Sequence, residues 1–131
     1  MAGHDRGVSD VFLARCAREI PGAQIGDGVF TEGQAIWCGT REVAHFPDAS
    51  GELEVRLTTA VVRPRRADLK ADDRVTLRKN ASGWIAFRIA TKADEDAALA
   101  LVRLAVDANA PTAALGPPPT GADLARRRRF H

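Results

Sequence analysis

Glu42 and His45 are the two side chains of this sequence with the clearest potential for chemistry. They lie three residues apart within residues 39–46 (GTREVAHF). Histidine titrates near neutral pH and a neighbouring carboxylate can orient its ring, so such a pair is a possible general acid–base. Side chains alternate along a strand, however, and residues at this spacing point to opposite faces unless a bulge intervenes. The pattern therefore favours a histidine bonded to backbone at a strand end and a solvated glutamate. A small enzyme that uses His45 is the alternative.

The remaining reactive side chains predict no metal, cofactor or catalytic residue. The supply of soft metal ligands is His4, His45, His131, Cys16 and Cys38, and their spacing matches no zinc motif. Both cysteines lie in apolar patterns, which predicts reduced, buried thiols, and Cys38 has no neighbouring base that would make it a nucleophile. No phosphate-binding or dinucleotide-binding fingerprint is present.

Aromatic and guanidinium side chains gather on one expected sheet face. Strand alternation places Trp84 and Arg88 outward, with Arg56, Arg78 and Trp37 beside them. Such side chains suit stacking on flat or anionic ligands, including single-stranded nucleic acid, although they are also common on a solvated strand face. The predicted binding residues are Trp37, Arg41, Glu42, His45, Arg56, Trp84 and Arg88.

Composition fits one globular domain. The chain has 131 residues, of which 45% are hydrophobic and 27% charged, and its net charge is +2. Its apolar runs are far shorter than the roughly 20 residues that cross a bilayer, and no signal peptide is evident. We therefore expect a cytoplasmic protein without membrane contact.

The charge is unevenly placed. Residues 1–109 carry 15 basic and 16 acidic side chains, so the excess positive charge belongs to Arg126, Arg127, Arg128 and Arg129. Residues 110–131 are rich in proline and glycine, which predicts a linker and basic tail without fixed structure. The four arginines are expected to be solvated, with weak nucleic-acid binding as the alternative.

Hydrophobic periodicity and turn residues predict the elements that must position these side chains. Residues 25–30 resemble an edge strand with a loop. Gly39-Thr40 favours a two-residue type II′ turn that pairs Trp37 with Glu42 and Ile36 with Val43. Residues 91–94 have the form of a capping box. We predict helices over 10–20, 64–71 and 94–108, strands over 34–38, 41–46, 53–57, 74–78 and 84–89, and a turn at 80–83.

These elements predict a two-layer α+β domain over residues 10–109, preceded by a flexible N-terminus over 1–9. One face of an antiparallel sheet of about five strands is apolar and must be covered by the N- and C-terminal helices, while the other face stays open. The expected core residues are Leu13, Cys16, Ile20, Ile36, Val43, Leu53, Val55, Leu57, Val75, Leu77, Ile85, Phe87, Ile89, Leu101, Val102 and Ala105.

Four segments of this chain resemble the small bacterial and fungal proteins of the luciferase-domain family. They are residues 39–45 (GTREVAH), 53–57 (LEVRL), 83–88 (GWIAFR) and 97–103 (AALALVR), and the likeness extends over about 11–109. The family name implies neither light emission nor a flavin or luciferin. Family members often carry a second histidine two residues after the one matched by His45, where this chain has Pro47. The general shape is more distantly similar to MmcQ/YjbR-type domains.

The resemblance and the open face together predict a small noncatalytic binding or accessory domain. The ligand would be a small molecule or another protein. The alternatives are single-stranded nucleic-acid binding through the open face and the basic tail, and an enzyme that uses His45.

Overall fold

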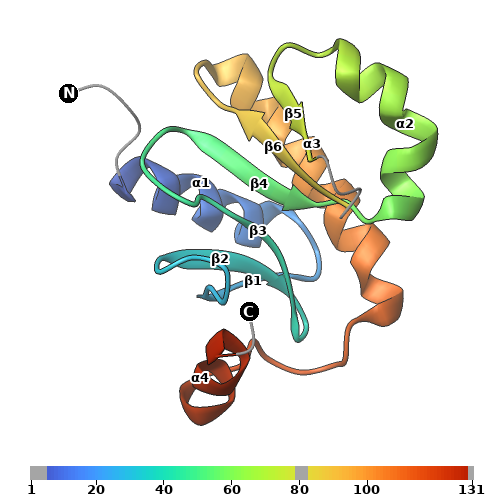
Figure 1. The fold of residues 1–131 in the computed structure, drawn as a ribbon. Coiled ribbons are helices and arrows are strands. Elements are labelled where there is room, and N and C mark those ends of the chain that lie inside the picture. The colour runs from blue at the N-terminus through green and yellow to red at the C-terminus, as the bar shows by residue number, and fades with distance from the viewer. Residues whose placement is uncertain (1–5, 79–82, 130–131) are drawn as a thin grey trace.

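The computed structural model describes residues 6–78 and 83–129 of the chain (Figure 1). The elements in chain order are α1 (Arg6–Glu19), β1 (Ala23–Asp27), β2 (Gln34–Cys38), β3 (Arg41–His45), β4 (Glu52–Arg56), α2 (Thr59–Ala71), β5 (Val75–Leu77), β6 (Trp84–Arg88), α3 (Lys92–Asn109), a 3₁₀ turn (Ala110–Thr112) and α4 (Gly121–Arg129). Residues 1–5 of the expected flexible N-terminus and residues 80–82 of the expected turn lie outside the described residues.

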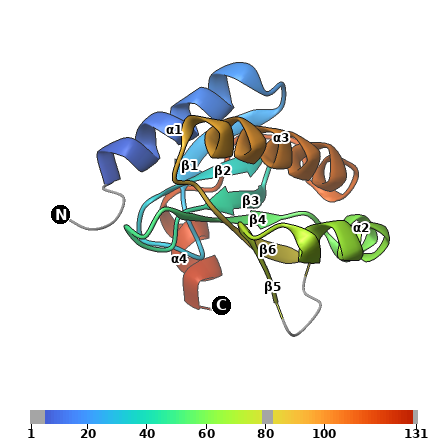
Figure 2. The ribbon, with the colours of Figure 1, turned by 90° about the horizontal axis from the view of Figure 1, so that it is seen from above.

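The strands form an antiparallel sheet in the order β1-β2-β3-β4-β6-β5. This confirms the predicted α+β class, with six strands in place of about five because β1 pairs along its whole length with β2. Helices α1 and α3 lie on one side of the sheet, and α4 lies on the other (Figure 2). Helix α2 packs beside β5 at the edge of the sheet.

The core lies between the sheet and helices α1 and α3, as the one-sided apolar pattern predicts. Of the expected core residues, the buried ones are Leu13, Cys16, Ile20, Ile36, Val43, Leu53, Val55, Leu57, Ile85, Phe87, Val102 and Ala105. Val75, Leu77, Ile89 and Leu101 are half-buried and pack against this cluster. Three of these four lie on or beside β5 and β6, where the sheet ends and fewer neighbours cover it.

Helix α2 begins earlier than predicted. It runs from Thr59 and includes Pro64, whereas the sequence suggested a start at the proline. Pro64 has no backbone N–H, so it removes one hydrogen bond of the helix close to its N-terminus. The apolar Val61 and Val62 pack against the core cluster and favour the longer helix.

The turn at Gly39-Thr40 has the predicted form. Cys38 pairs with Arg41 across a two-residue loop, and Gly39 has a φ of 58°. Thr40 is not among the residues with positive φ, which distinguishes a type II′ turn from type I′. The hairpin therefore holds Arg41 and Glu42 in a defined register beside β2.

Residues 110–129 have defined structure, unlike the linker and disordered tail that the sequence suggested. A 3₁₀ turn follows α3, and an extended segment leads to α4. Leu124 of α4 is buried against Trp37 and Ala35 on the otherwise open sheet face. Burial of this leucine offsets part of the entropy lost when the segment becomes ordered. The division of the chain at residues 10 and 109 stays a prediction.

Candidate functional site

A β-bulge in β3 brings Glu42 and His45 to the same face of the sheet. Trp37 pairs with Glu42 as predicted, but Ile36 pairs with Ala44 and not with Val43, so β3 contains one residue more than β2 at this point. An extra residue reverses the alternation of side chains beyond it. The expectation that Glu42 and His45 point to opposite faces is therefore wrong.

His45 lies between two carboxylates. Its Nδ1 is 2.7 Å from Oε2 of Glu42, and its Nε2 is 2.8 Å from Oε1 of Glu54. Glu54 is the cross-strand partner of His45 on β4, so the sheet register itself creates this contact. The side chains of Glu42 and His45 are 1% and 2% exposed, which excludes the solvated glutamate that the sequence favoured.

This cluster offers more carboxylate acceptors than a neutral imidazole has N–H donors. A neutral imidazole carries one N–H, whereas two carboxylates face the two ring nitrogens of His45. The Nδ1 atom and Oε2 of Glu42 are close but lack the alignment of a hydrogen bond, and neither atom has another partner among the described residues. Buried polar atoms are rarely left unpaired, and when they are, a functional role is one explanation.

A loop from β1 to β2 closes over His45. The other carboxylate oxygen of Glu42 accepts a 2.5 Å hydrogen bond from the Val29 amide, and the Thr31 hydroxyl donates to the Phe46 carbonyl at 3.1 Å. These bonds place Phe30 parallel to the His45 ring, with 6.1 Å between the ring centroids. The buried glutamate thus positions both the histidine and the aromatic loop.

Trp84 of β6 completes an aromatic wall beside His45. Its ring centroid lies 5.1 Å from that of His45 and 5.4 Å from that of Phe30. Phe30, His45, Glu54, Arg78 and Trp84 line an open cavity of about 190 Å³, which we call the histidine hollow. Glu54 also forms an ion pair with Arg78 and is 15% exposed, so it is the carboxylate of the cluster that meets the hollow.

The guanidinium of Arg56 packs against the two aromatic rings of this wall. Its guanidinium lies 5.3 Å from the Trp84 ring centroid and 5.8 Å from that of Phe30, and it donates to the Glu42 carbonyl at 3.3 Å. Burial lowers the pKa of Arg56, and the nearby charge of Arg41 lowers it further. An arginine stays protonated at neutral pH despite such a shift.

The other predicted binding residues are dispersed. Trp37 is 1% exposed beneath Leu124, and its indole N–H donates to the Asp27 carbonyl at 3.2 Å, so the expectation of an outward tryptophan is wrong. Arg41 donates to Asn109 Oδ1 at 2.6 Å. Arg88 is exposed opposite Glu52 and does not line the histidine hollow.

The arginines of the expected tail lie on α4. Arg127 donates to the Thr40 carbonyl at 2.7 Å, and Arg128 donates to the Gly28 carbonyl at 2.8 Å. Arg126 pairs with Asp123 within the helix, and Arg129 ends it. Two of the four guanidiniums therefore hold α4 against the sheet instead of extending freely into solvent.

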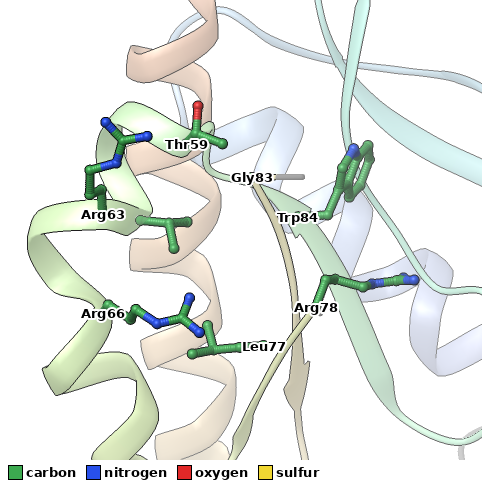
Figure 3. A pocket seen from close by; sticks show the side chains of 8 residues that line it. Thr59, Arg63, Arg66, Leu77, Arg78, Gly83 and Trp84 are labelled. Carbon is green, nitrogen blue, oxygen red and sulfur yellow. The ribbon is translucent and has the colours of Figure 1, made fainter. Parts of the chain in front are cut away.

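A second cavity of about 160 Å³ lies between α2 and the β5–β6 edge (Figure 3). Arg63 and Arg66 approach it from α2, whereas Arg78 and Trp84 point away from that helix. Its lining includes neither histidine nor carboxylate. We therefore place the chemistry in the histidine hollow, which shares Arg78 and Trp84 with this cavity.

The described residues contain no group of three His, Cys, Asp or Glu side chains arranged to hold a metal ion. In the cluster, Glu42 and Glu54 lie on opposite edges of the His45 ring, so their oxygens do not converge on one point. Burial raises the pKa of the Cys16 thiol to about 12 and also raises that of Cys38, and both cysteines are free and buried as predicted. Among residues 6–78 and 83–129, no helix is both long and apolar enough to span a membrane.

Sequence reasoning missed Glu54 and Phe30, and it placed Arg127 in a solvated tail, whereas Arg127 bonds to the Thr40 carbonyl. Glu54 alternates with Leu53 and Val55 and reads as an ordinary solvated residue, and only the β3–β4 register places it beside His45. Phe30 lies in a glycine-rich loop whose position depends on the buried Glu42. The sequence analysis named a bulge as the condition for Glu42 and His45 to share a face, but no residue of the hairpin marks where a bulge occurs.

Comparison with known proteins gives one family. A family model described as a luciferase domain matches residues 40–105. This range contains Glu42, His45, Glu54, Arg78 and Trp84, and it excludes the Phe30 loop and α4. No match was found among curated proteins or among solved structures.

Proposed function

The chain belongs to the luciferase-domain family, and from this premise we propose that it is a small-molecule-binding domain whose ligand occupies the histidine hollow. The observation that carries the proposal is the position of His45 and Glu54 at an open cavity lined by Phe30 and Trp84. Ligand sites typically combine aromatic walls with a few convergent polar groups.

The dimensions and the polar groups of the hollow suggest the class of ligand. An apolar cavity of about 150 Å³ can hold benzene, so a hollow of about 190 Å³ suits a planar ring that stacks on Phe30 or Trp84. Glu54 and Arg78 offer an acceptor and a donor at its rim. We therefore expect a planar ligand with at least one hydrogen-bonding substituent.

The same contacts support a second candidate, an enzyme that moves a proton. Here Glu54 would exchange the proton with a substrate in the hollow, and His45 would carry it on toward the buried Glu42. A buried histidine bracketed by carboxylates is the specific feature that favours this candidate. A cytoplasmic location stays a prediction for either function.

Single-stranded nucleic-acid binding has less support. Trp37 is covered by α4, and Arg127 and Arg128 lie on that helix beside backbone carbonyls instead of on a free basic tail. Trp84 remains half-buried among Phe30, His45 and Arg56, which offers little surface for successive stacked bases.

The binding proposal is tested by a ligand screen on three forms of the full-length chain. Planar compounds with polar substituents are screened by thermal shift against the wild type, Glu54→Gln and Glu52→Gln, because a ligand of the native state raises its melting temperature. Glu52 is the matched control, since it lies on the same strand and face as Glu54 but outside the hollow. Loss of a charged hydrogen bond should weaken binding about 10- to 100-fold in Glu54→Gln only.

Two outcomes would contradict the proposal: no compound stabilises the wild type, or Glu52→Gln weakens binding as much as Glu54→Gln does. The enzyme candidate makes a further demand on the same compounds. Any compound that the wild type converts to a product should bind Glu54→Gln without conversion at comparable occupancy.

A further inference from the structure

Three guanidinium groups surround another depression, which shares Phe30 with the histidine hollow. This depression of about 140 Å³, which we call the arginine hollow, is lined by Val29, Phe30, Trp37, Thr40, Arg41, Glu42, Arg56 and Arg127. Its arginines come from β3, β4 and α4, so three separate elements bring positive charge to one place.

The three arginines bond to neutral oxygens and not to carboxylates. Within the described part of the chain, none of them forms an ion pair. Their hydrogen bonds go to neutral oxygens instead: the side chain of Asn109 for Arg41, and the carbonyls of Glu42 and Thr40 for Arg56 and Arg127. The arginine hollow therefore carries an excess of positive charge.

Glu42 is the single carboxylate in this lining, and it is already engaged. Its Oε1 accepts from the Val29 amide, and its Oε2 faces His45. Its negative charge also acts to raise the pKa of Arg56, which burial lowers, but one carboxylate among three guanidiniums leaves an excess of positive charge. Meanwhile Arg56 is half-buried, and an unpaired charge removed from water is costly.

From this arrangement we propose that the arginine hollow is a binding site for a small oxyanion, a phosphate or carboxylate group. A guanidinium presents five N–H donors in a planar fork that matches both groups, and Arg41, Arg56 and Arg127 each direct few of theirs to protein acceptors. An anion bound there would compensate the charge of all three. The site is distinct from the histidine hollow and does not depend on its proposed function.

The test uses the full-length protein with inorganic phosphate and with acetate as probes. Each is titrated at constant ionic strength maintained with sodium chloride, and binding is followed by calorimetry and by the NMR signal of the indole N–H of Trp37, which lines the hollow. We expect saturable binding of at least one probe, and the more tightly bound probe identifies the group as phosphate or carboxylate.

Two variants and one control separate a built site from diffuse charge. Arg56→Gln and Arg127→Gln should each raise the dissociation constant of the bound probe about tenfold or more, and Arg56→Lys should lose less because it keeps the charge. Arg88→Gln removes an exposed arginine outside the hollow and should leave binding unchanged. Circular dichroism verifies that each variant is folded, and Arg127 on the peripheral α4 offers a test that does not disturb the sheet.

The proposal is overturned if neither probe binds beyond the effect of sodium chloride. It is equally overturned if Arg88→Gln weakens binding as much as Arg127→Gln, because the protein would then attract anions through net charge alone. Failure of either kind leaves the screen on the histidine hollow unaffected, since that screen depends on Glu54 and Trp84.

Discussion

Glu42 shows how one buried side chain can organise a site. It accepts from the Val29 amide with one oxygen and approaches His45 with the other, so a single carboxylate links the Phe30 loop to the histidine. Glu54 approaches the opposite ring nitrogen from the next strand and is the member open to the hollow. Glu42 therefore positions the histidine and the Phe30 loop, whereas Glu54 faces the histidine hollow.

The two cysteines provide a separate prediction at the residue scale. Burial raises the pKa of both thiols, so at pH 8 they are almost entirely protonated and shielded from solvent. We expect alkylation by iodoacetamide, followed by mass spectrometry, to be much slower in the native protein than in denaturant. Rapid native labelling of Cys38 would contradict its burial and would reopen the nucleophile that the sequence analysis set aside.

Helix α4 is the element that most alters the expected surface. Leu124 packs on Trp37 and Ala35, while Arg127 and Arg128 donate to carbonyls on either side. Full burial of a leucine stabilises by about 1.5–3 kcal/mol, which offsets part of the entropy lost when α4 becomes ordered.

Leu124→Ala should therefore release α4 and expose Trp37, with a red shift of tryptophan emission as the measured result. Leu115→Ala is the matched control, because Leu115 is 99% exposed, and it should leave the emission unchanged. An unaltered spectrum in Leu124→Ala would show that the leucine does not hold α4 over Trp37.

The elements were more predictable than the site. Periodicity, a capping box and a glycine turn located α3 and the hairpin of β2 and β3, because these signals act locally. Periodicity also located α1, but this helix begins at Arg6 and not near residue 10 as predicted. The bulge at Val43 was not predictable in this way, since an inserted residue leaves no mark on composition. Without that bulge Glu42 and His45 remain apart, which is why the sequence favoured the wrong arrangement.

Helix α4 was not predictable for a related reason. Proline, glycine and four consecutive arginines lack a core-forming pattern, and the docking of α4 depends on a single leucine that meets a tryptophan far away in the sequence. Contacts of that kind are decided by tertiary packing and not by local propensity.

In the molecule as a whole, the two sides of the sheet differ in what covers them. One side carries the core beneath α1 and α3. The other carries the histidine hollow and the arginine hollow, which share Phe30, and Arg127 of α4 lines the arginine hollow. Because each hollow is lined by a different tryptophan, the two sites can be observed separately in one spectrum.

The most direct test of the central claim follows the indole N–H signals of Trp84 and Trp37 by two-dimensional NMR while a compound from the thermal-shift screen is added. Trp84 lines the histidine hollow, and Trp37 lines the arginine hollow beneath α4. In the wild type we expect the Trp84 signal to shift until the site is saturated, while the Trp37 signal moves little. In Glu54→Gln the same shift of the Trp84 signal should require about tenfold or more compound. A compound that stabilises the protein but leaves the Trp84 signal in place would contradict it.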